Sequence, residues 1–239
     1  MEDIKIYLSY VIIFLSLNFL SITQVLSADC EDVAGNSKTI STSCTDLDIT
    51  GDSSNVTINS GVTIDETGGG SWTAIGLTDT TNTTITNNGT ISTSQKWALR
   101  NNATSAITNL TNNGTISAGS TSTIRNIGSI TTLTNTGTIS ATGDSAILNN
   151  KAGTIGTITN SGTISANRYG LKNVGTITTL SNSGTISADS NFAISNTGSI
   201  GTFTNTGTLT PTGATGISNQ GSITTFNNSQ GKSGSNPVT

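Results

Sequence analysis

The chain has 239 residues and a formal net charge of −4 at pH 7, and only 9% of its residues are charged and 4% aromatic. A chain of this length can bury one sizeable core, and the low charge excludes the highly charged kind of disordered protein. The acidic balance gives no electrostatic reason to bind nucleic acid, and the absence of histidine from the sequence excludes Ser-His-Asp and Cys-His catalytic sets.

The amino-terminal segment has the pattern of a secretory signal peptide. Residues 6–22 are mainly apolar, and small residues follow at a cleavage point after Ser27 or Ala28. The segment before the apolar run carries two acidic residues against one lysine, so retention as an uncleaved anchor is the alternative. We therefore assign residues 1–27 to a signal peptide and exclude them from the fold.

Residues 28–72 are expected to form an N-terminal cap with the first irregular coil or coils. The two cysteines of the sequence, Cys30 and Cys44, lie in this segment. In an exported chain a pair this close forms a disulfide that closes a short loop. A metal site would need further ligands, and no histidine exists to supply them. We expect a disulfide here, with no metal and no cofactor.

A repeat fills residues 73–228. The pattern [A/G]-[I/L]-x-N recurs, exactly or nearly, in steps of 25, 23, 24, 23 and 23 residues. Its copies start at Ala98, Thr123, Ala146, Gly170, Ala193 and Gly216. A second motif, N-x-G-[T/S]-[I/L], recurs within the units, and in four successive units two such glycines lie nine residues apart. Such regular spacing predicts a solenoid of stacked repeats.

Apolar residues alternate within each unit, which is the strand signature. One unit places these residues on the inward side: Ile124, Asn126, Gly128, Ile130, Leu133, Asn135, Gly137, Ile139 and Ala141. The three-residue step from Ile130 to Leu133 breaks the alternation and predicts a corner. Asn-x-Gly predicts further corners or bulges, because both residues tolerate left-handed backbone conformations.

Short strands joined by corners every 23 residues or so predict an all-β fold, a right-handed single-stranded parallel β-helix. Equivalent residues then form columns along the stack. One inward column contains Ile124, Ile147, Leu171, Ile194 and Ile217, and another contains Leu133, Ile158, Leu180, Phe203 and Phe226. A third column is a predicted ladder of hydrogen-bonded amides formed by Asn87, Asn112, Asn135, Asn160, Asn182 and Asn205.

Other folds fit the repeat less well. A β-sandwich needs no near-identical 23-residue unit, and a leucine-rich horseshoe needs several leucines and a helical return in each unit. A disordered tract would not keep apolar residues in step over six copies.

Four strings of the repeat are nearly identical: TITNNGTIS (84–92), TLTNTGTIS (132–140), TITNSGTIS (157–165) and TLSNSGTIS (179–187). Together with the leader and the short cysteine-containing stretch, they resemble the passenger regions of bacterial autotransporters. The resemblance implies secretion through the periplasm to the cell surface of a Gram-negative-type bacterium. It also implies an outer-membrane β-barrel translocator in the full-length protein. Residues 229–239, an expected unstructured or truncated tail, carry no such segments, which leaves the export route open.

Catalytic groups are sparse in the repeat. After Asp79 the acidic residues are Asp144 and Asp189, in variable loops two coils apart, with Arg168 in the loop between them. Sugar hydrolysis needs a pair of carboxylates, so we expect no catalytic residues and no enzyme, and a polysaccharide-active enzyme is the minor alternative. Alternating charges at these loops are expected to lie on a solvated surface.

An aromatic group and a basic stripe are further candidates for ligand binding. The aromatic residues Trp97, Tyr169 and Phe192 directly precede the [A/G]-[I/L] step, and Trp72 lies nearby. Strict alternation predicts that these rings pack in the core or at a corner, and a sugar-binding strip is the alternative. A basic stripe is formed by Arg100, Arg125 and Lys172 and is interrupted by Leu148, Ser195 and Ser218. A solvated face is the expected interpretation of the stripe, and binding of an acidic glycan is the alternative.

The remaining outward feature is a Thr/Ser ladder on the strands that follow the second Asn-x-Gly. It contains Thr90, Ser92, Thr115, Ser117, Thr138, Ser140, Thr163, Ser165, Thr185, Ser187, Thr208 and Thr210. Thr suits exposed strands, and such an array also resembles the surfaces of β-solenoid ice-binding proteins. The sequence therefore predicts a non-catalytic surface stalk or adhesin with a possible host or environmental ligand (glycan or protein), and a glycan- or ice-binding solenoid is the alternative.

Overall fold

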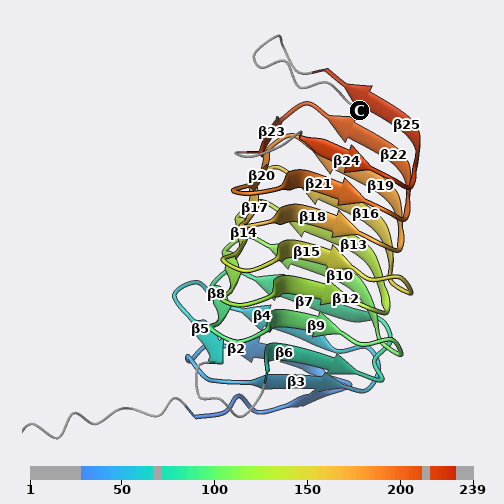
Figure 1. Cartoon of the computed structure of the whole chain (residues 1–239). Coiled ribbons are helices and arrows are strands. Elements are labelled where there is room, and N and C mark those ends of the chain that lie inside the picture. Colours follow the sequence, from blue (N-terminus) through green and yellow to red (C-terminus); the bar gives the residue numbers. More distant parts are fainter. Residues whose placement is uncertain (1–27, 67–71, 212–215, 230–239) are drawn as a thin grey trace, which may run out of the picture.

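The computed structural model describes residues 28–66, 72–211 and 216–229. Every regular element in these ranges is a β-strand, and all strand pairs are parallel (Figure 1). The predicted fold class is confirmed: the protein is an all-β solenoid of about seven turns with roughly 23 residues per turn. The predicted signal peptide and residues 230–239 of the predicted tail lie outside the described residues.

Three parallel sheets form the walls of the solenoid, and each of the seven coils from β3–β5 to β21–β23 contributes one strand to each sheet. The first sheet contains β1 (Val33–Ala34), β3 (Leu47–Thr50), β6 (Thr73–Thr78), β9 (Trp97–Asn101), β12 (Ser122–Asn126), β15 (Ser145–Asn149), β18 (Tyr169–Asn173), β21 (Phe192–Asn196) and β24 (Ile217–Asn219). The second contains β2 (Ser37–Ile40), β4 (Asn55–Ile58), β7 (Thr83–Asn87), β10 (Ala106–Asn112), β13 (Ser129–Asn135), β16 (Thr154–Asn160), β19 (Thr176–Asn182), β22 (Ser199–Asn205) and β25 (Ser222–Asn228). The third contains β5 (Thr63–Glu66), β8 (Thr90–Thr93), β11 (Thr115–Ala118), β14 (Thr138–Ala141), β17 (Thr163–Ala166), β20 (Thr185–Ala188) and β23 (Thr208–Pro211).

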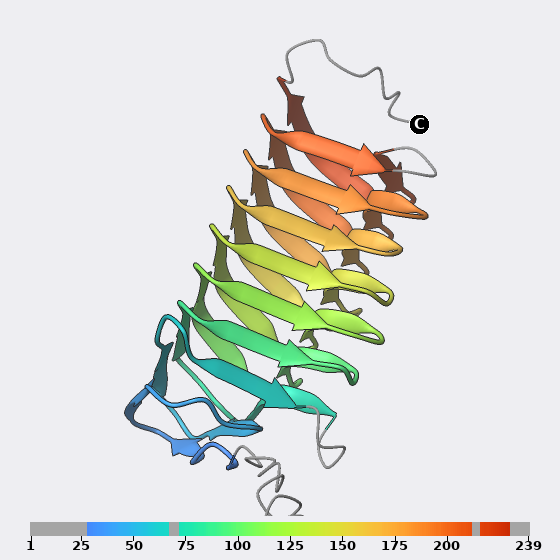
Figure 2. The same ribbon diagram turned by 90° about the vertical axis from the view of Figure 1, so that its left-hand side faces the viewer.

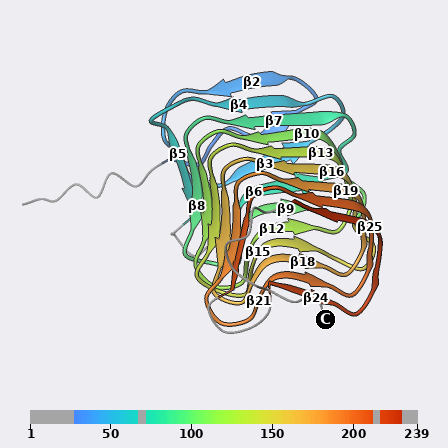
Figure 3. The same cartoon turned by 90° about the horizontal axis from the view of Figure 1, so that it is seen from above.

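The path of the chain makes the coil right-handed. Seen from above in Figure 3, each coil passes from the second sheet to the third and then to the first in a counter-clockwise sense, and later coils lie nearer the viewer. In the regular coils the two Asn-x-Gly turns connect the first sheet to the second and the second to the third, and the variable loop closes the coil. Figure 2 shows the strands of successive coils stacked in the same direction.

Identical residues stack in register along the interior, as the repeat predicts. Ile124 pairs with Ile147 and Leu133 with Ile158, and each of these side chains is fully buried. Burial of one aliphatic side chain of this size contributes about 1.5–3 kcal/mol, so a column of such residues stabilises every interface between coils. Because an alternating strand cannot slip by one residue without exposing its apolar face, the columns also fix the register.

The predicted corner between Ile130 and Leu133 is wrong. Strand β13 is continuous across this step, and two successive outward residues, Thr131 and Thr132, restore the inward alternation. The register passes from Ile130 to Thr132 without a partner for Thr131. The step is therefore an irregularity inside one strand, and the corners of the coil are the two Asn-x-Gly turns and the variable loop.

The reason given above for the glycines is also wrong. Among the described residues, the glycines with positive φ are Gly35, Gly51 and Gly61, all of them in the first two coils. A Cβ added to Gly137 would instead collide with the carbonyl oxygen of Gly114 in the preceding coil. The Asn-x-Gly glycines are therefore required by the close approach of stacked backbones and not by a left-handed conformation.

The described part of the cap predicted over residues 28–72, residues 28–66, already belongs to the same sheets. Strands β3, β4 and β5 form a coil that pairs in parallel with β6, β7 and β8. The described C-terminal end is more open, because the apolar residues of β25 are only partly buried. There the ring of Phe226 stacks on Phe203 of the preceding coil with centroids 4.9 Å apart.

Candidate functional site

The six asparagines of the predicted ladder lie in one buried row beneath the second Asn-x-Gly turn. In every step the Nδ2 group of one amide donates to the Oδ1 atom of the next coil at 2.7–2.9 Å, and the row continues to Asn228. Asn135 Nδ2 also donates to the carbonyl oxygen of Thr163 at 3.1 Å. Since a buried amide without partners is costly, each asparagine holds its two neighbouring coils together.

A second ladder beneath the first Asn-x-Gly turn was not predicted from the sequence. Its amides are linked in the same way at 2.7–2.9 Å. It contains Asn101, Asn126, Asn149, Asn173, Asn196 and Asn219. The signal was present, because Asn126 shares the inward alternation and the Asn-x-Gly motif of the first ladder. Both ladders serve the architecture.

The two cysteines are joined at the N-terminal end of the solenoid. Cys30 and Cys44 form a disulfide with their Cα atoms 5.0 Å apart and a sequence separation of 14. Cys44 also makes a parallel bridge with Ile64 of β5, so the disulfide ties the first residues described to the edge of the third sheet.

The twelve residues of the predicted Thr/Ser ladder lie on the outer side of the third sheet. Thr115 pairs with Thr138 and Ser117 with Ser140, and this register is kept from β8 to β23. Most of these side chains are half-buried, and those of β23 are exposed. At the N-terminal end the row meets a carboxylate, since Ser92 Oγ donates to Asp65 Oδ1 at 2.8 Å.

The aromatic residues Trp97, Tyr169 and Phe192 do not lie in the core. Ala98 and Leu99 are both fully buried although they are successive, so strict alternation fails at this step and Trp97 is half-buried at the corner. The same irregularity places Tyr169 and Phe192 at the corner, half-buried and stacked with ring centroids 6.4 Å apart. The core alternative is wrong for these rings, and the corner alternative describes them.

Cationic side chains gather around Trp97, and we call this group the Trp97 cluster: Trp72, Lys96, Trp97, Arg100 and Arg125. The Cζ atoms of Arg100 and Arg125 lie 5.2 and 4.8 Å from the centre of the Trp97 ring. Lys96 Nζ lies 3.4 Å from the centre of the Trp72 ring and 5.7 Å from that of Trp97. Trp72 is 56% exposed and is the exposed large apolar side chain of the described ranges. These contacts are cation–π interactions at a partly solvated surface.

The guanidinium groups of the Trp97 cluster are crowded. Arg100 and Arg125 are register partners on adjacent strands. Burial, and then the neighbouring charge of Arg100, lower the pKa of the Arg125 guanidinium. Asn150, with its amide oxygen turned toward Arg125, accepts from Nε at 3.1 Å and Nη2 at 3.3 Å. Within the part of the chain that the structure describes, Arg100 Nε is buried without a hydrogen-bond partner.

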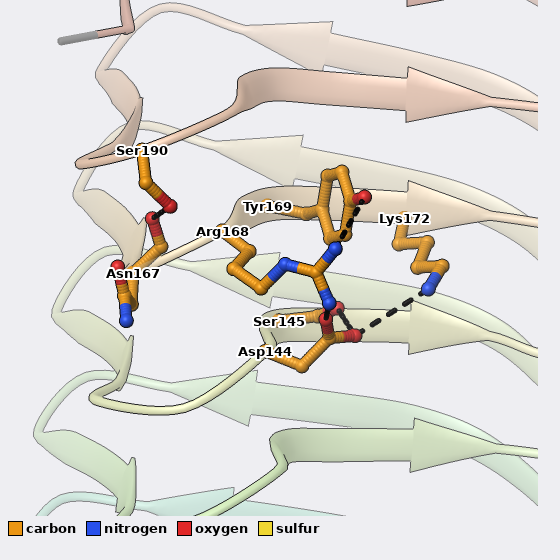
Figure 4. A network of polar contacts seen from close by, with 7 residues as sticks. All are labelled: Asp144, Ser145, Asn167, Arg168, Tyr169, Lys172 and Ser190. Atoms are coloured by element: carbon orange, nitrogen blue, oxygen red, sulfur yellow. Dashed lines mark hydrogen bonds and ion pairs between the residues drawn. The ribbon is translucent and has the colours of Figure 1, made fainter. Parts of the chain in front are cut away.

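Three coils farther along, a related group contains a carboxylate, and we call it the Tyr169 cluster: Asp144, Arg168, Tyr169 and Lys172 (Figure 4). Asp144 accepts from Arg168 Nη1 at 3.0 Å and from Lys172 Nζ at 3.5 Å. The two cations also lie 5.2 and 4.8 Å from the Tyr169 ring centre. The cations of the Tyr169 cluster are therefore paired with a carboxylate of the protein, Asp144. In the Trp97 cluster, no ion pair occurs among residues 28–66, 72–211 and 216–229.

Within the ranges that the structure covers, no three His, Cys, Asp or Glu side chains gather in a way that could hold a metal ion. No helix in those ranges has the length and apolar character needed to cross a membrane. No family model, no curated protein and no solved structure matches the chain.

Proposed function

We propose that the protein is an exported, non-catalytic β-solenoid that acts as a surface stalk or adhesin of a Gram-negative-type bacterium, in the manner of an autotransporter passenger. The observation that carries this proposal is the pair of uninterrupted asparagine ladders. They tie successive coils together along the rod. A rod stacked in this way suits a protein that holds a ligand-binding or cell-contacting region away from a membrane.

Two features support export and a structural role. The Cys30–Cys44 disulfide is a feature of proteins that fold in oxidising compartments. The Asp144 carboxylate, the most central acid of the repeat, is engaged by Arg168 and Lys172 in an arrangement that orders the surface. In this proposal the ligand is a glycan or a protein, and nucleic acid is not a partner.

Export is tested with the full chain, tagged at its C-terminal end and produced in a Gram-negative host. We expect a chain that begins after Ser27 or Ala28, that lies in the periplasm or outside the cell, and that has no free thiol. A cytoplasmic chain that keeps Met1 and two reactive thiols would contradict the proposal. The Cys30→Ala/Cys44→Ala variant is the control that separates export from disulfide formation.

The absence of catalysis is part of the proposal and has its own test. The purified protein is incubated with acidic and neutral polysaccharides, and reducing ends are measured over time. We expect no release above a heat-denatured control, and sustained release would show an enzyme.

The Thr/Ser ladder favours one alternative, a solenoid that binds glycan or ice through its third sheet. Its hydroxyl groups keep strict register over six strands. Thermal hysteresis and ice recrystallisation measure this directly. We expect neither effect, and hysteresis that is lost on replacement of Thr138 and Thr163 by Lys would establish ice binding.

A further inference from the structure

The Trp97 and Tyr169 clusters are built on the same frame of corner and strand. In both, the aromatic ring opens a strand of the first sheet, with one cation directly before it and another three residues after it. The register pairs Thr73 with Trp97 and Ser145 with Tyr169. The corner residue one coil before the ring is therefore Trp72 in the first cluster and Asp144 in the second.

The Asp144 carboxylate shows which chemistry this corner accepts. It lies between a guanidinium and an ammonium group beside the Tyr169 ring (Figure 4). Charge-assisted hydrogen bonds of this kind are about twice as strong as neutral ones. In the Tyr169 cluster the protein thus supplies its own acid for the cations of the corner.

In the Trp97 cluster no acid of the described ranges pairs with a cation, and the cluster carries a larger charge. Lys96, Arg100 and Arg125 give three positive charges, against two in the Tyr169 cluster. In the column of Arg100, the next residue toward the N-terminal end is Gly76, and Asp48 follows one coil farther. Among the described residues the buried Arg100 Nε has no hydrogen-bond partner, which leaves a donor free for an acidic group of a ligand.

We propose that the Trp97 cluster binds an acidic polysaccharide, with a carboxylate or sulfate group on Arg100 and Arg125 and a sugar ring against the exposed Trp72. Guanidinium groups recognise both anions through paired hydrogen bonds, and an exposed indole offers an apolar face to a sugar ring. The two arginines lie on adjacent strands about 4.8 Å apart, a distance on the order of the length of one sugar residue. This inference does not depend on the stalk or adhesin role.

Charge density favours a polysaccharide over a nucleic acid. Duplex DNA carries one charge per about 1.7 Å of axis, and its binding is dominated by the number of phosphates that are neutralised. The present chain has a net charge of −4, and the Trp97 cluster gathers only three of its nine lysines and arginines. Three cations beside an indole fit a chain with widely spaced charges and apolar ring faces.

The two tryptophans of the sequence both belong to the cluster, so tryptophan fluorescence reports on this site alone. The full-length protein is titrated with polygalacturonate, which carries carboxylates, with dextran sulfate, and with uncharged dextran. We expect a saturable change in emission with one or both acidic polymers, weakened by salt, and none with dextran. The two acidic polymers distinguish a carboxylate ligand from a sulfate ligand.

Matched double variants separate the site from general charge. Arg100→Ala/Arg125→Ala is expected to weaken binding by roughly tenfold or more, since two charge-assisted contacts are lost. Arg168→Ala/Lys172→Ala removes the same charge from the Tyr169 cluster and is expected to change affinity by less than about twofold. Arg100→Lys/Arg125→Lys keeps the charge but loses the planar donor pairs, and we expect intermediate affinity. Circular dichroism and thermal melting confirm that each variant is folded.

Three results would overturn the proposal. The first is an emission unchanged at saturating concentrations of both acidic polymers. The second is an equal loss of affinity in the two alanine double variants, which would show attraction by general charge only. The third is tighter binding of a single-stranded oligonucleotide through the same residues, which would assign the cluster to nucleic acid.

Discussion

The Asn-x-Gly turns and the corner that precedes the strands of the first sheet belong to the same repeat, but they differ in how far the residues can change. At the turn before β14, Asn135 is fully buried between its copies, and Gly137 has no space for a Cβ. At the corner, the residue that opens the strand changes from coil to coil. In successive coils it is Trp97, Ser122, Ser145, Tyr169 and Phe192.

The difference shows where a repeat can acquire a site. An inward residue meets its own copy above and below, so one substitution disturbs two interfaces. At the corner the aromatic residues are half-buried and the two serines are buried, so this position accepts side chains of very different size without loss of stacking. The two cation–aromatic clusters both occur at this corner. In the Tyr169 cluster Asp144 pairs with the cations, and in the Trp97 cluster no acid of the described residues does so.

Substitution of a glycine in an Asn-x-Gly turn gives the largest expected loss of stability. In Gly137→Ala the new Cβ would meet the carbonyl oxygen of Gly114, and the backbones of two coils would have to separate. We expect a loss of roughly 4 kcal/mol in the free energy of unfolding, at the upper end of single substitutions. Urea denaturation followed by circular dichroism measures this loss.

Gly76→Ala is the matched control for that measurement. Its added Cβ would lie 2.7 Å from Asp48 Oδ1, the end of a side chain that can rotate away. We expect a loss below about 1 kcal/mol, since surface substitutions usually have small effects. Equal losses in the two variants would mean that contact between stacked backbones does not decide the glycine requirement.

The N-terminal end gives the next largest effect. Removal of the disulfide in Cys30→Ala/Cys44→Ala frees a segment of 14 residues, and a loop of this size corresponds to about 3 kcal/mol. Because each coil contacts only its neighbours, the loss is expected in the first coils and not in the middle of the rod. Hydrogen exchange should show faster exchange in β2 and β4 and unchanged exchange in β16. Uniformly faster exchange along the rod would contradict this localisation.

Two adjacent asparagines, one in the buried ladder and one on the surface, allow the stabilising effect of the ladder to be measured. Asn112 donates to Asn135 and accepts from Asn87 within the ladder, whereas Asn113 is exposed and donates to Asn88. Asn112→Ala leaves a buried donor and a buried acceptor unpaired, and we expect a loss of about 2 kcal/mol in unfolding free energy. Asn113→Ala is expected to cost less than about 0.5 kcal/mol. Similar losses in the two variants would remove the structural argument for the ladder.

The interior could be predicted from the sequence because stacking makes it periodic. The Ile124 column, the Asn135 ladder and the coil length all follow from residues that recur in step. The irregular steps could not be predicted, because a break in alternation has the same appearance whether it is a corner or an extra residue within a strand. This ambiguity explains the wrong corner at Ile130 and the wrong core alternative for Trp97.

The candidate site was only partly predictable for a related reason. Alternation places Arg100 and Arg125 outward, and the structure agrees. Their contacts with Trp97 depend on which coils lie side by side and on how far long side chains extend along the surface. The pairing of Asp144 with Arg168 joins residues 24 positions apart, a distance that only the register of stacked coils makes short.

The smallest predicted effect is a gain in stability on the outer face. Burial, and then the charge of Asp32, raise the pKa of Asp48, whose backbone N–H donates to Asp32 Oδ1 at 3.2 Å. A carboxyl with a raised pKa binds its proton more tightly in the folded state. Its contribution is therefore fully present below the ordinary pKa of 3.8 and is lost as the pH rises through the higher folded value.

Asp48→Asn removes this penalty, and we expect the variant to be more stable than the wild type at neutral pH. The gain should be roughly 0.3–0.5 kcal/mol, because the group is largely exposed and solvent screens the interaction. It should disappear near about pH 3, where the wild-type carboxyl is protonated as well. Denaturation midpoints of both proteins at the two pH values give the difference, and Asp189→Asn in an exposed loop is the control. A variant that is less stable at neutral pH would show that the Asp48 charge stabilises this face, and the outer surface would then be less tolerant than the corner residues indicate.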